Sequence, residues 1–180
     1  MPSEARLDQV RLEALFASSE RRLGLFLRHM VRDPELADDL LQQTFVTALQ
    51  TWPQLADVDN PEAWLFRVAR NHALQALRRR RRWLRAVQRF ATGITEQPNT
   101  DDAEALALRD LLIRELSPDD RSLVLLRYVH GYSGQELADV LGVSAAAVRQ
   151  RLSRATRHLA AVMTAMGYRP NESGSPRERG

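Results

Sequence analysis

Lysine and cysteine are both absent from this chain of 180 residues, and aromatic residues make up only 6% of it. Without cysteine, the chain can form neither a disulfide nor a thiolate metal site. All 26 basic residues are arginines. Arginine codons can be GC-rich while lysine codons cannot, so this usage suggests a GC-rich bacterial genome. An arginine-rich stretch is therefore weaker support for nucleic-acid binding here than in a chain that also uses lysine.

Long hydrophobic runs are missing as well. No apolar stretch approaches the roughly 20 residues of a membrane span. The first ten residues, MPSEARLDQV, carry acids and no apolar segment, so we do not expect a signal peptide. With 44% hydrophobic and 27% charged residues, the chain should bury a core. We expect a soluble, cytoplasmic protein.

Nothing in the sequence predicts catalysis. The histidines are scattered without the spacing of metal ligands, at His29, His72, His130 and His158. No glycine-rich phosphate-binding loop is present. We therefore expect no cofactor, no metal ion and no catalytic residue.

Charge is strongly segregated along the chain. The net charge is −4 over residues 1–60, +8 over 61–90, −6 over 91–120 and +5 over 121–180. Residues 76–90, ALRRRRRWLRAVQRF, contain seven arginines, five of them consecutive. Two basic blocks on either side of an acidic one suggest two patches for a polyanion. Two amphipathic domains with ordinary surfaces would explain the charges equally well.

The periodicity of apolar residues is helical throughout. Asp33-Pro34 and Asn60-Pro61 each place a capping side chain before a proline, as at helix starts. Residues 91–104 have a linker composition with four acids. The fold class is therefore all-α, with two small helical domains joined by a flexible acidic linker. The predicted bounds are 10–88, a linker at 89–104, 105–165, and a disordered tail at 166–180.

The helical spacing also predicts individual core residues and loops. Leu49 is expected on the buried stripe of the helix after Asp33, and residues 52–60 are expected as a loop. A helix capped at Ser117 should bury Leu123, Val124, Leu126 and Tyr128 and end at Gly131.

The strongest local signal is SGQELADVLGVSAAAVRQRLSRATRHLA, residues 133–160. Ser133 and Glu136 form a capping box. Gly142 stands where a helix ends in a left-handed conformation, and Ser144 can cap the next helix. Two short helices joined by a tight, glycine-containing turn predict a helix-turn-helix.

The second of these helices presents a basic face. Arginine can read guanine and glutamine can read adenine, while other arginines hold phosphates. A basic helix packed in a bundle is the alternative. The predicted DNA-contacting residues are Ser144, Ala145, Arg149, Gln150, Arg151, Ser153, Arg154 and Arg157.

These residues carry a family resemblance. LSPDDRSLVLLRYVHGYSGQELADVLGVSAAAVRQRLSRATRHL resembles the C-terminal DNA-binding region of bacterial extracytoplasmic-function sigma factors. ADDLLQQTFVTALQTW resembles their polymerase-binding helix, and NPEAWLFRVARNHALQALRRRRR the helix that reads the −10 element. The resemblance covers residues 12–163. It implies a stress-response type of sigma factor that binds core RNA polymerase, recognises −35 and −10 promoter elements and promotes DNA opening.

The resemblance also implies which residues would act. Asp38, Asp39, Gln42 and Gln43 would bind the β′ coiled coil of core polymerase. Asn71, Gln75, Arg78 and Arg79 lie on one helix face, which would meet the −10 element. The preceding loop, with Asp57, Asp59 and Asn60, would hold a flipped base at a cost of a few kcal/mol.

Further partners follow from the same resemblance. The β flap of polymerase and promoter DNA are expected, and so is an anti-sigma factor. Membrane contact is expected only through a membrane-bound anti-sigma factor. The acidic linker would enter the RNA path of the polymerase, with Glu96, Asp101, Asp102 and Glu104 imitating transcript charge.

Two other functions remain open on the residues alone. A helix-turn-helix regulator that never joins polymerase would explain residues 106–163 but leaves 34–82 without a role. An arginine-rich RNA-binding protein would bind structured RNA as well as a promoter duplex.

Overall fold

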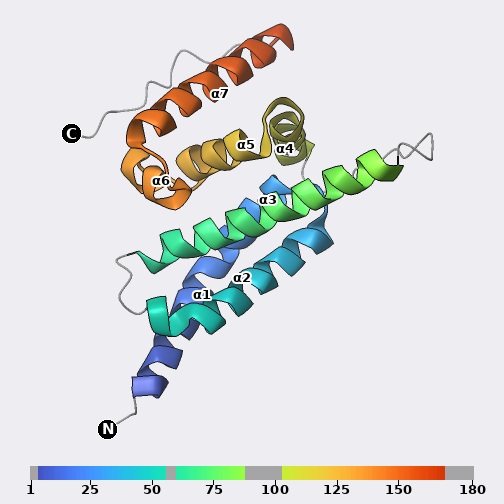
Figure 1. Cartoon of the computed structure of the whole chain (residues 1–180). Coiled ribbons are helices and arrows are strands. Elements are labelled where there is room, and N and C mark those ends of the chain that lie inside the picture. The colour runs from blue at the N-terminus through green and yellow to red at the C-terminus, as the bar shows by residue number, and fades with distance from the viewer. Residues whose placement is uncertain (1–3, 56–59, 88–102, 169–180) are drawn as a thin grey trace.

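The computed structural model describes residues 4–55, 60–87 and 103–168. These residues form helices and contain no strand (Figure 1), so the all-α prediction is confirmed. The helices are α1 (Glu4–Met30), α2 (Pro34–Leu55), α3 (Pro61–Val87), α4 (Ala103–Glu115), α5 (Pro118–Val124), the π-helix η1 (Leu125–Val129), α6 (Gly134–Leu141) and α7 (Ala145–Ala165). Among the described helices, none is long and apolar enough to cross a membrane.

The first three helices pack into a bundle. Asp33 Oδ1 accepts a hydrogen bond from the Leu36 N–H at 3.2 Å, and Asn60 Oδ1 accepts one from the Ala63 N–H at 2.9 Å. Both predicted helix starts are therefore real caps. The bundle core contains fully buried Phe26 and Phe66, whose rings meet edge to face with centroids 5.5 Å apart.

The remaining helices form a second group. Ser117 Oγ caps α5 by accepting from the Asp120 N–H at 3.1 Å. Leu123, Leu125 and Leu126 are completely buried, as is Leu137 of α6. These side chains fix α5, η1 and α6 as one unit, on which α7 packs.

The two groups are packed against each other. Helix α5 contacts both α1 and α3, η1 contacts α1, and α6 contacts α3. The buried residues of both groups form one continuous hydrophobic cluster. In Figure 1, α3 lies between α2 and the second group. Helical spacing in the sequence predicts each group but contains no signal for this contact.

Three sequence predictions were wrong. Residues 52–55 of the expected loop at 52–60 are helical, because α2 continues to Leu55. Leu49 is 57% exposed and Tyr128 is 63% exposed, although both were placed in the core. Tyr128 lies in η1, where the His130 N–H bonds to the Leu125 carbonyl at 3.1 Å. That wider turn breaks the 3.6-residue period, so Leu125 is buried and Tyr128 faces outward.

Several predictions fall outside the described residues. These are the roles of Asp57 and Asp59, the acidic linker with Glu96, Asp101 and Asp102, and the tail beyond residue 168. Glu104 lies in α4.

Candidate polymerase and nucleic-acid interfaces

The helix-turn-helix has the predicted local geometry. Ser133 Oγ accepts from the Glu136 N–H at 3.2 Å, and Glu136 Oε2 accepts from the Ser133 N–H at 2.7 Å. The bonds from Ser133 hold the pKa of Glu136 below its usual range. Gly142 ends α6 with a φ of 65°, a left-handed conformation that glycine adopts without strain. Ser144 Oγ caps α7 by accepting from the Ala147 N–H at 3.2 Å.

One side of α7 is buried and the other is open. Val148 and Ala155 pack inside. Most of the predicted DNA-contacting side chains are exposed, and residues three and four apart lie on one helix face. Arg157 Nε donates to the Ser153 carbonyl at 3.1 Å. The exposed members of the set are Arg149, Gln150, Ser153, Arg154 and Arg157.

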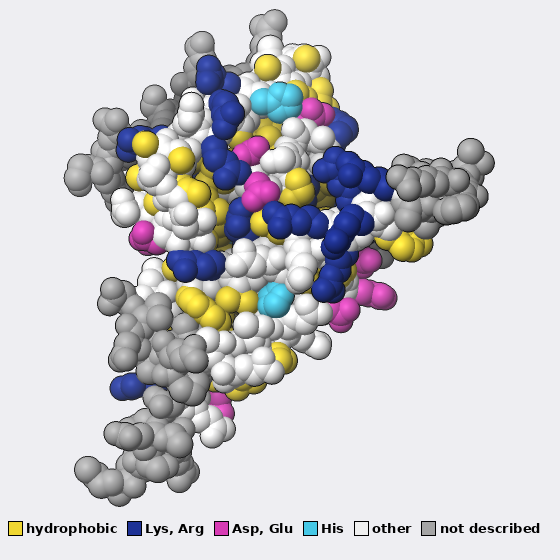
Figure 2. Space-filling view, in the orientation of Figure 1, with side chains coloured by type: hydrophobic (Ala, Val, Ile, Leu, Met, Phe, Trp, Pro, Cys, Tyr) yellow, Lys and Arg dark blue, Asp and Glu magenta, His cyan; other side chains and the backbone are white. Residues whose placement is uncertain are grey.

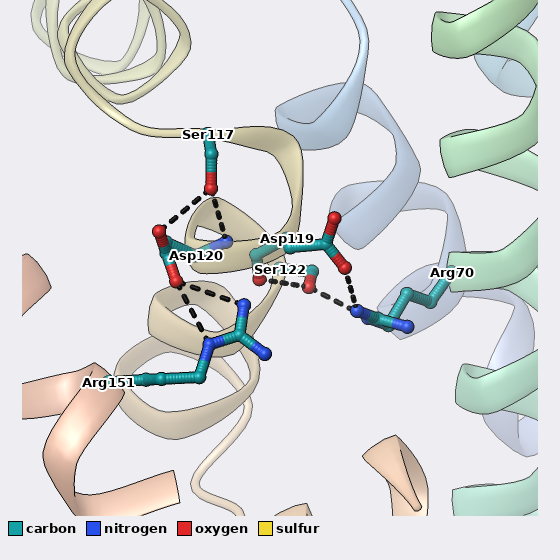
Figure 3. A network of polar contacts seen from close by, with 6 residues as sticks. All are labelled: Arg70, Ser117, Asp119, Asp120, Ser122 and Arg151. Atoms are coloured by element: carbon teal, nitrogen blue, oxygen red, sulfur yellow. Dashed lines mark hydrogen bonds and ion pairs between the residues drawn. The ribbon is translucent and has the colours of Figure 1, made fainter. Parts of the chain in front are cut away.

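Three other predicted residues of this helix-turn-helix have structural partners or are partly buried. Arg151 donates from Nε and Nη2 to Asp120 Oδ1 at 3.2 and 3.0 Å, which fastens α7 to α5. The Ser144 hydroxyl caps α7, and Ala145 is half-buried. Figure 3 shows that Asp120 also accepts from Ser117 Oγ, at 2.8 Å. Sequence reasoning missed Asp120 because its position predicts only a helix-start acid.

The predicted −10 face of α3 is open. Asn71, Gln75, Arg78 and Arg79 are all exposed. Asn60 is exposed too, and its amide oxygen caps α3. Trp83, farther along α3, is 58% exposed. In Figure 2, arginine side chains gather over α3 and continue onto α7 on the same face of the molecule. This face can therefore accept a polyanion.

The four predicted polymerase-binding residues line two neighbouring hollows beside α2. The larger, of about 760 Å³, lies between α1 and α2 and includes Asp38 and Gln42. Asp38 pairs there with Arg28 of α1 at 3.3 Å. The smaller, of about 470 Å³, includes Asp39, Gln42 and Gln43. All four side chains are exposed.

Apolar residues that sequence reasoning missed adjoin these hollows. Val46 lines the smaller hollow and is 50% exposed, and Leu25 lines the larger and is 44% exposed. Leu49 follows Val46 by three positions, so both lie on one side of α2. A signal was present in the sequence, since Val46 follows Gln42 and Gln43 by four and three positions. Such a mixed apolar and acidic surface suits a protein partner.

His72 of α3 borders the smaller hollow. Its Nε2 lies 3.1 Å from Thr47 Oγ1, and partial burial lowers the pKa of His72. The described residues contain no group of three or more histidine and acidic side chains that could hold a metal ion.

The chain matches known protein families in two segments. The family model described as Sigma-70 region 2 matches residues 15–83, and Sigma-70, region 4 matches residues 104–159. RNA polymerase sigma factor CarQ of Myxococcus xanthus is 35% identical over 144 residues, which cover 79% of this chain and 83% of CarQ. ECF RNA polymerase sigma factor SigL of Mycobacterium tuberculosis is 30% identical over 161 residues, covering 87% of this chain and 90% of SigL.

Solved structures share the fold. CnrH in complex with the cytosolic domain of CnrY superposes with a TM-score of 0.65 and 27% identity, covering 87% of this chain and 90% of CnrH. The sigma factor RpoE of Bartonella quintana, solved with the anti-sigma factor NepR, gives a TM-score of 0.67 at 23% identity over 87% of this chain and 96% of RpoE.

Proposed function

The chain belongs to the extracytoplasmic-function sigma factors of the sigma-70 family, and from this premise we propose which of its surfaces perform the steps of transcription initiation. The single observation that carries the proposal is the division of exposed polar faces among three helices. Helix α2 carries Asp38, Asp39, Gln42 and Gln43, α3 carries Asn71 and Gln75, and α7 carries Gln150 and Arg154.

Helix α2 binds core polymerase. Its acids offer charge to basic residues of the β′ coiled coil, and Val46 supplies apolar contact beside them. An interface of this composition gains orientation from charge and affinity from desolvated apolar area. We assign polymerase binding to the domain formed by residues 10–88. The same domain recognises the −10 element.

Helix α3 reads the −10 element and α7 the −35 element. Asn71 and Gln75 offer amide donors and acceptors to bases, while Arg78 and Arg79 hold the backbone. On α7, Gln150 reads a base, and Arg149, Arg154 and Arg157 bind phosphates or guanine. Arg151 and Ser144 position the helix instead, since their polar atoms already have partners. Residues 105–165 form this second domain.

The chain itself contributes no catalysis under this proposal. Bond formation belongs to the polymerase, and the chain supplies specificity and promoter opening. Because polymerase acts on the chromosome, we place this work in the cytoplasm. The β flap is a second polymerase contact.

An anti-sigma factor is a further proposed partner. Its support is the likeness to CnrH, which was solved bound to the cytosolic domain of CnrY. Such a partner would cover the hollows beside α2 and exclude polymerase. The measurement is competition: a purified anti-sigma factor should displace the chain from core polymerase.

Run-off transcription with purified core polymerase tests the proposal. The chain should direct a promoter-specific transcript, and Asp39→Arg should reduce core binding at least about tenfold because it reverses a charge in the smaller hollow. Glu13→Arg is the control, since it makes the same charge reversal at an exposed residue of α1 that lines neither hollow. Absence of both core binding and any promoter-specific product would exclude the sigma function.

A further inference from the structure

The surfaces assigned to polymerase and to the −10 element meet at His72. Helices α2 and α3 lie side by side (Figure 1). His72 follows Asn71 by one position on α3, and its half-buried side chain lines the smaller hollow beside α2. Its Nε2 lies 3.1 Å from Thr47 Oγ1 of α2. A side chain of the DNA-reading helix therefore reaches the surface that we assign to polymerase.

The hydrogen bonds of Thr47 determine which nitrogen of His72 carries the proton. The Thr47 hydroxyl donates to the Gln43 carbonyl one turn earlier, at 2.8 Å. Because a hydroxyl has a single proton, Thr47 Oγ1 can only accept from the imidazole. Nε2 is therefore the N–H donor, and Nδ1 of the neutral ring is an acceptor. Nδ1 has no hydrogen-bond partner among the described residues.

The bond from His72 to Thr47 is directional, unlike the packing of fully buried Ala48 beside it. Apolar packing has no preferred direction, whereas a hydrogen bond weakens steeply as its angle closes. The bond thus favours one rotation of α3 about its axis. Side chains reach about 5–6 Å from a helix axis, so turning α3 by about 10° would move the tips of Asn71 and Gln75 by roughly 1 Å. Hydrogen-bond lengths vary by only about 0.5 Å.

The smaller hollow gives a partner access to the same imidazole. Its lining consists of Asp39, Gln42, Gln43, Val46 and Thr47 of α2 and His72 of α3. A basic donor that enters it can bond to the unpaired Nδ1 while the Asp39 carboxylate compensates its charge. A partner held in this way would contact α3 as well as α2.

We propose that His72 is a positioning residue that links core binding on α2 to reading of the −10 element on α3. Its Nε2–H holds α3 against Thr47 in the rotation that presents Asn71 and Gln75. Its Nδ1 accepts a donor from the polymerase segment in the smaller hollow. The identity of both partners rests on the proposed function, whereas the bond between the helices is a property of the chain itself.

Discrimination of the −10 element by the holoenzyme tests the bond to Thr47. The measurement is the ratio of affinities for a −10 probe and for the same probe with one base pair replaced, taken at each position. Thr47→Val and His72→Leu should each lower the largest ratio at least about fivefold, the lower end of what one base contact supplies. Thr47→Ser keeps the hydroxyl and His72→Gln keeps an N–H donor, so both should preserve the ratio.

Thr51 supplies a matched control. Like Thr47, it is a half-buried threonine of α2, and its hydroxyl donates to the carbonyl four residues earlier, at 2.7 Å. Thr51→Val therefore removes the same kind of helix bond and leaves the bond to His72 in place. Its −10 discrimination should equal that of the unaltered chain. If circular dichroism shows Thr47→Val to be unfolded, the comparison of His72→Leu with His72→Gln replaces it.

The pH dependence of core binding tests the contact at Nδ1. Protonation turns Nδ1 from an acceptor into a donor, so acid should weaken core binding. Burial lowers the pKa of His72 from 6.5, which places this loss below pH 6.5. His72→Gln keeps an amide oxygen that does not titrate. From pH 8 to pH 5, the unaltered chain should lose at least about threefold more core affinity than His72→Gln.

The comparison cancels the other charged groups near His72. Asp39 of α2 is the other titratable side chain that lines the smaller hollow, and the exposed Arg79 lies two turns farther along α3. Both are present in the unaltered chain and in His72→Gln, as are all groups of the polymerase. A difference between the two pH profiles therefore reports on residue 72.

The outcomes separate the role of His72 from the sigma function. Equal −10 discrimination by Thr47→Val and Thr51→Val, or parallel pH profiles for the unaltered chain and His72→Gln, would overturn the role of His72 while the sigma function stands. An unaltered chain that neither binds core nor prefers the −10 element would remove both. Discrimination that falls in Thr47→Val and returns in Thr47→Ser, together with diverging pH profiles, supports the proposal.

Discussion

Arg151 of α7 and Asp120 of α5 form a two-donor ion pair, with Nε and Nη2 at 3.2 and 3.0 Å from one carboxylate oxygen. Asp120 is in turn held by Ser117 Oγ at 2.8 Å. The position of α7 is therefore set from outside the helix-turn-helix, by the start of α5.

This pair predicts a positioning effect on DNA binding. Asp120→Ala should weaken binding to the −35 duplex about as much as Arg151→Ala, because each releases the same tether. The double variant should be no weaker than either single one, since interacting residues are not additive. Binding measured across salt concentrations checks the cause. An unchanged salt slope for both variants identifies positioning, whereas a slope reduced by about one unit in Arg151→Ala alone identifies a phosphate contact.

Arg154 lies on the open face of α7 and should behave differently. Arg154→Ala should weaken binding by a similar factor on specific and unrelated duplexes and reduce the salt slope by about one unit. Arg114→Ala is the matched control, because Arg114 is also exposed but lies on α4. A slope identical to that of the unaltered chain would remove Arg154 from the phosphate contacts.

Gln150 should affect which DNA sequence the chain prefers more than how tightly the chain binds DNA. Gln150→Ala should relax preference at one base pair by about 1–3 kcal/mol, the range for loss of a specific side-chain contact to a base. Selection of bound duplexes from a random pool, repeated with the variant, measures this change. Recovery of the same motif by both proteins contradicts the assignment.

Acid should weaken the packing around His130. Burial, then the charges of Arg22 and His29, lowers the pKa of His130 to about 4 from 6.5. A folded-state pKa below the unfolded value means that stability is complete above pH 6.5 and is lost as pH falls toward 4. Between pH 7 and 5.5 the urea midpoint should fall.

His130→Leu is the variant that isolates this effect. Nε2 of His130 is buried without a hydrogen-bond partner among the described residues, so an apolar side chain removes a titrating group and breaks no bond at Nε2. The urea midpoint of the variant should fall less over the same pH range. An equal fall in both proteins would assign the acid sensitivity to other groups.

Local sequence signals predicted helix ends well because caps are local. Asp33, Asn60, Ser117, Ser133 and Ser144 were all read as caps and all accept the backbone bond. A capping side chain and the N–H it satisfies lie within three residues, so the sequence contains both partners.

Burial was harder to predict where a helix departs from the 3.6-residue period, or where a neighbouring helix covers only part of an apolar stripe. Tyr128 was assigned to the core by a 3.6-residue period that η1 does not follow. Leu49 extends an apolar stripe, but α2 meets α1 and α3 through other residues of its surface, including fully buried Ala48. Spacing identifies a face and does not say which part of it a neighbour covers.

The functional residues also divide into those that local sequence patterns identify and those that depend on partners distant in the sequence. Exposed polar positions on α2, α3 and α7 followed from family motifs and helix spacing. Arg151 differs because its partner, Asp120, is 31 positions away in sequence. Arg70, Arg22 and Arg121 depend on partners still more distant. No single-sequence pattern links such pairs.

The open hollows beside α2 have a consequence for the time course of assembly. Both hollows are lined only by residues of the first three helices, so a polymerase that binds there meets α1, α2 and α3 without displacing any helix of the second group. The rate of this first encounter should rise linearly with polymerase concentration. A partner that covers the hollows would therefore act on the encounter itself and would leave the DNA-facing side of α7 open.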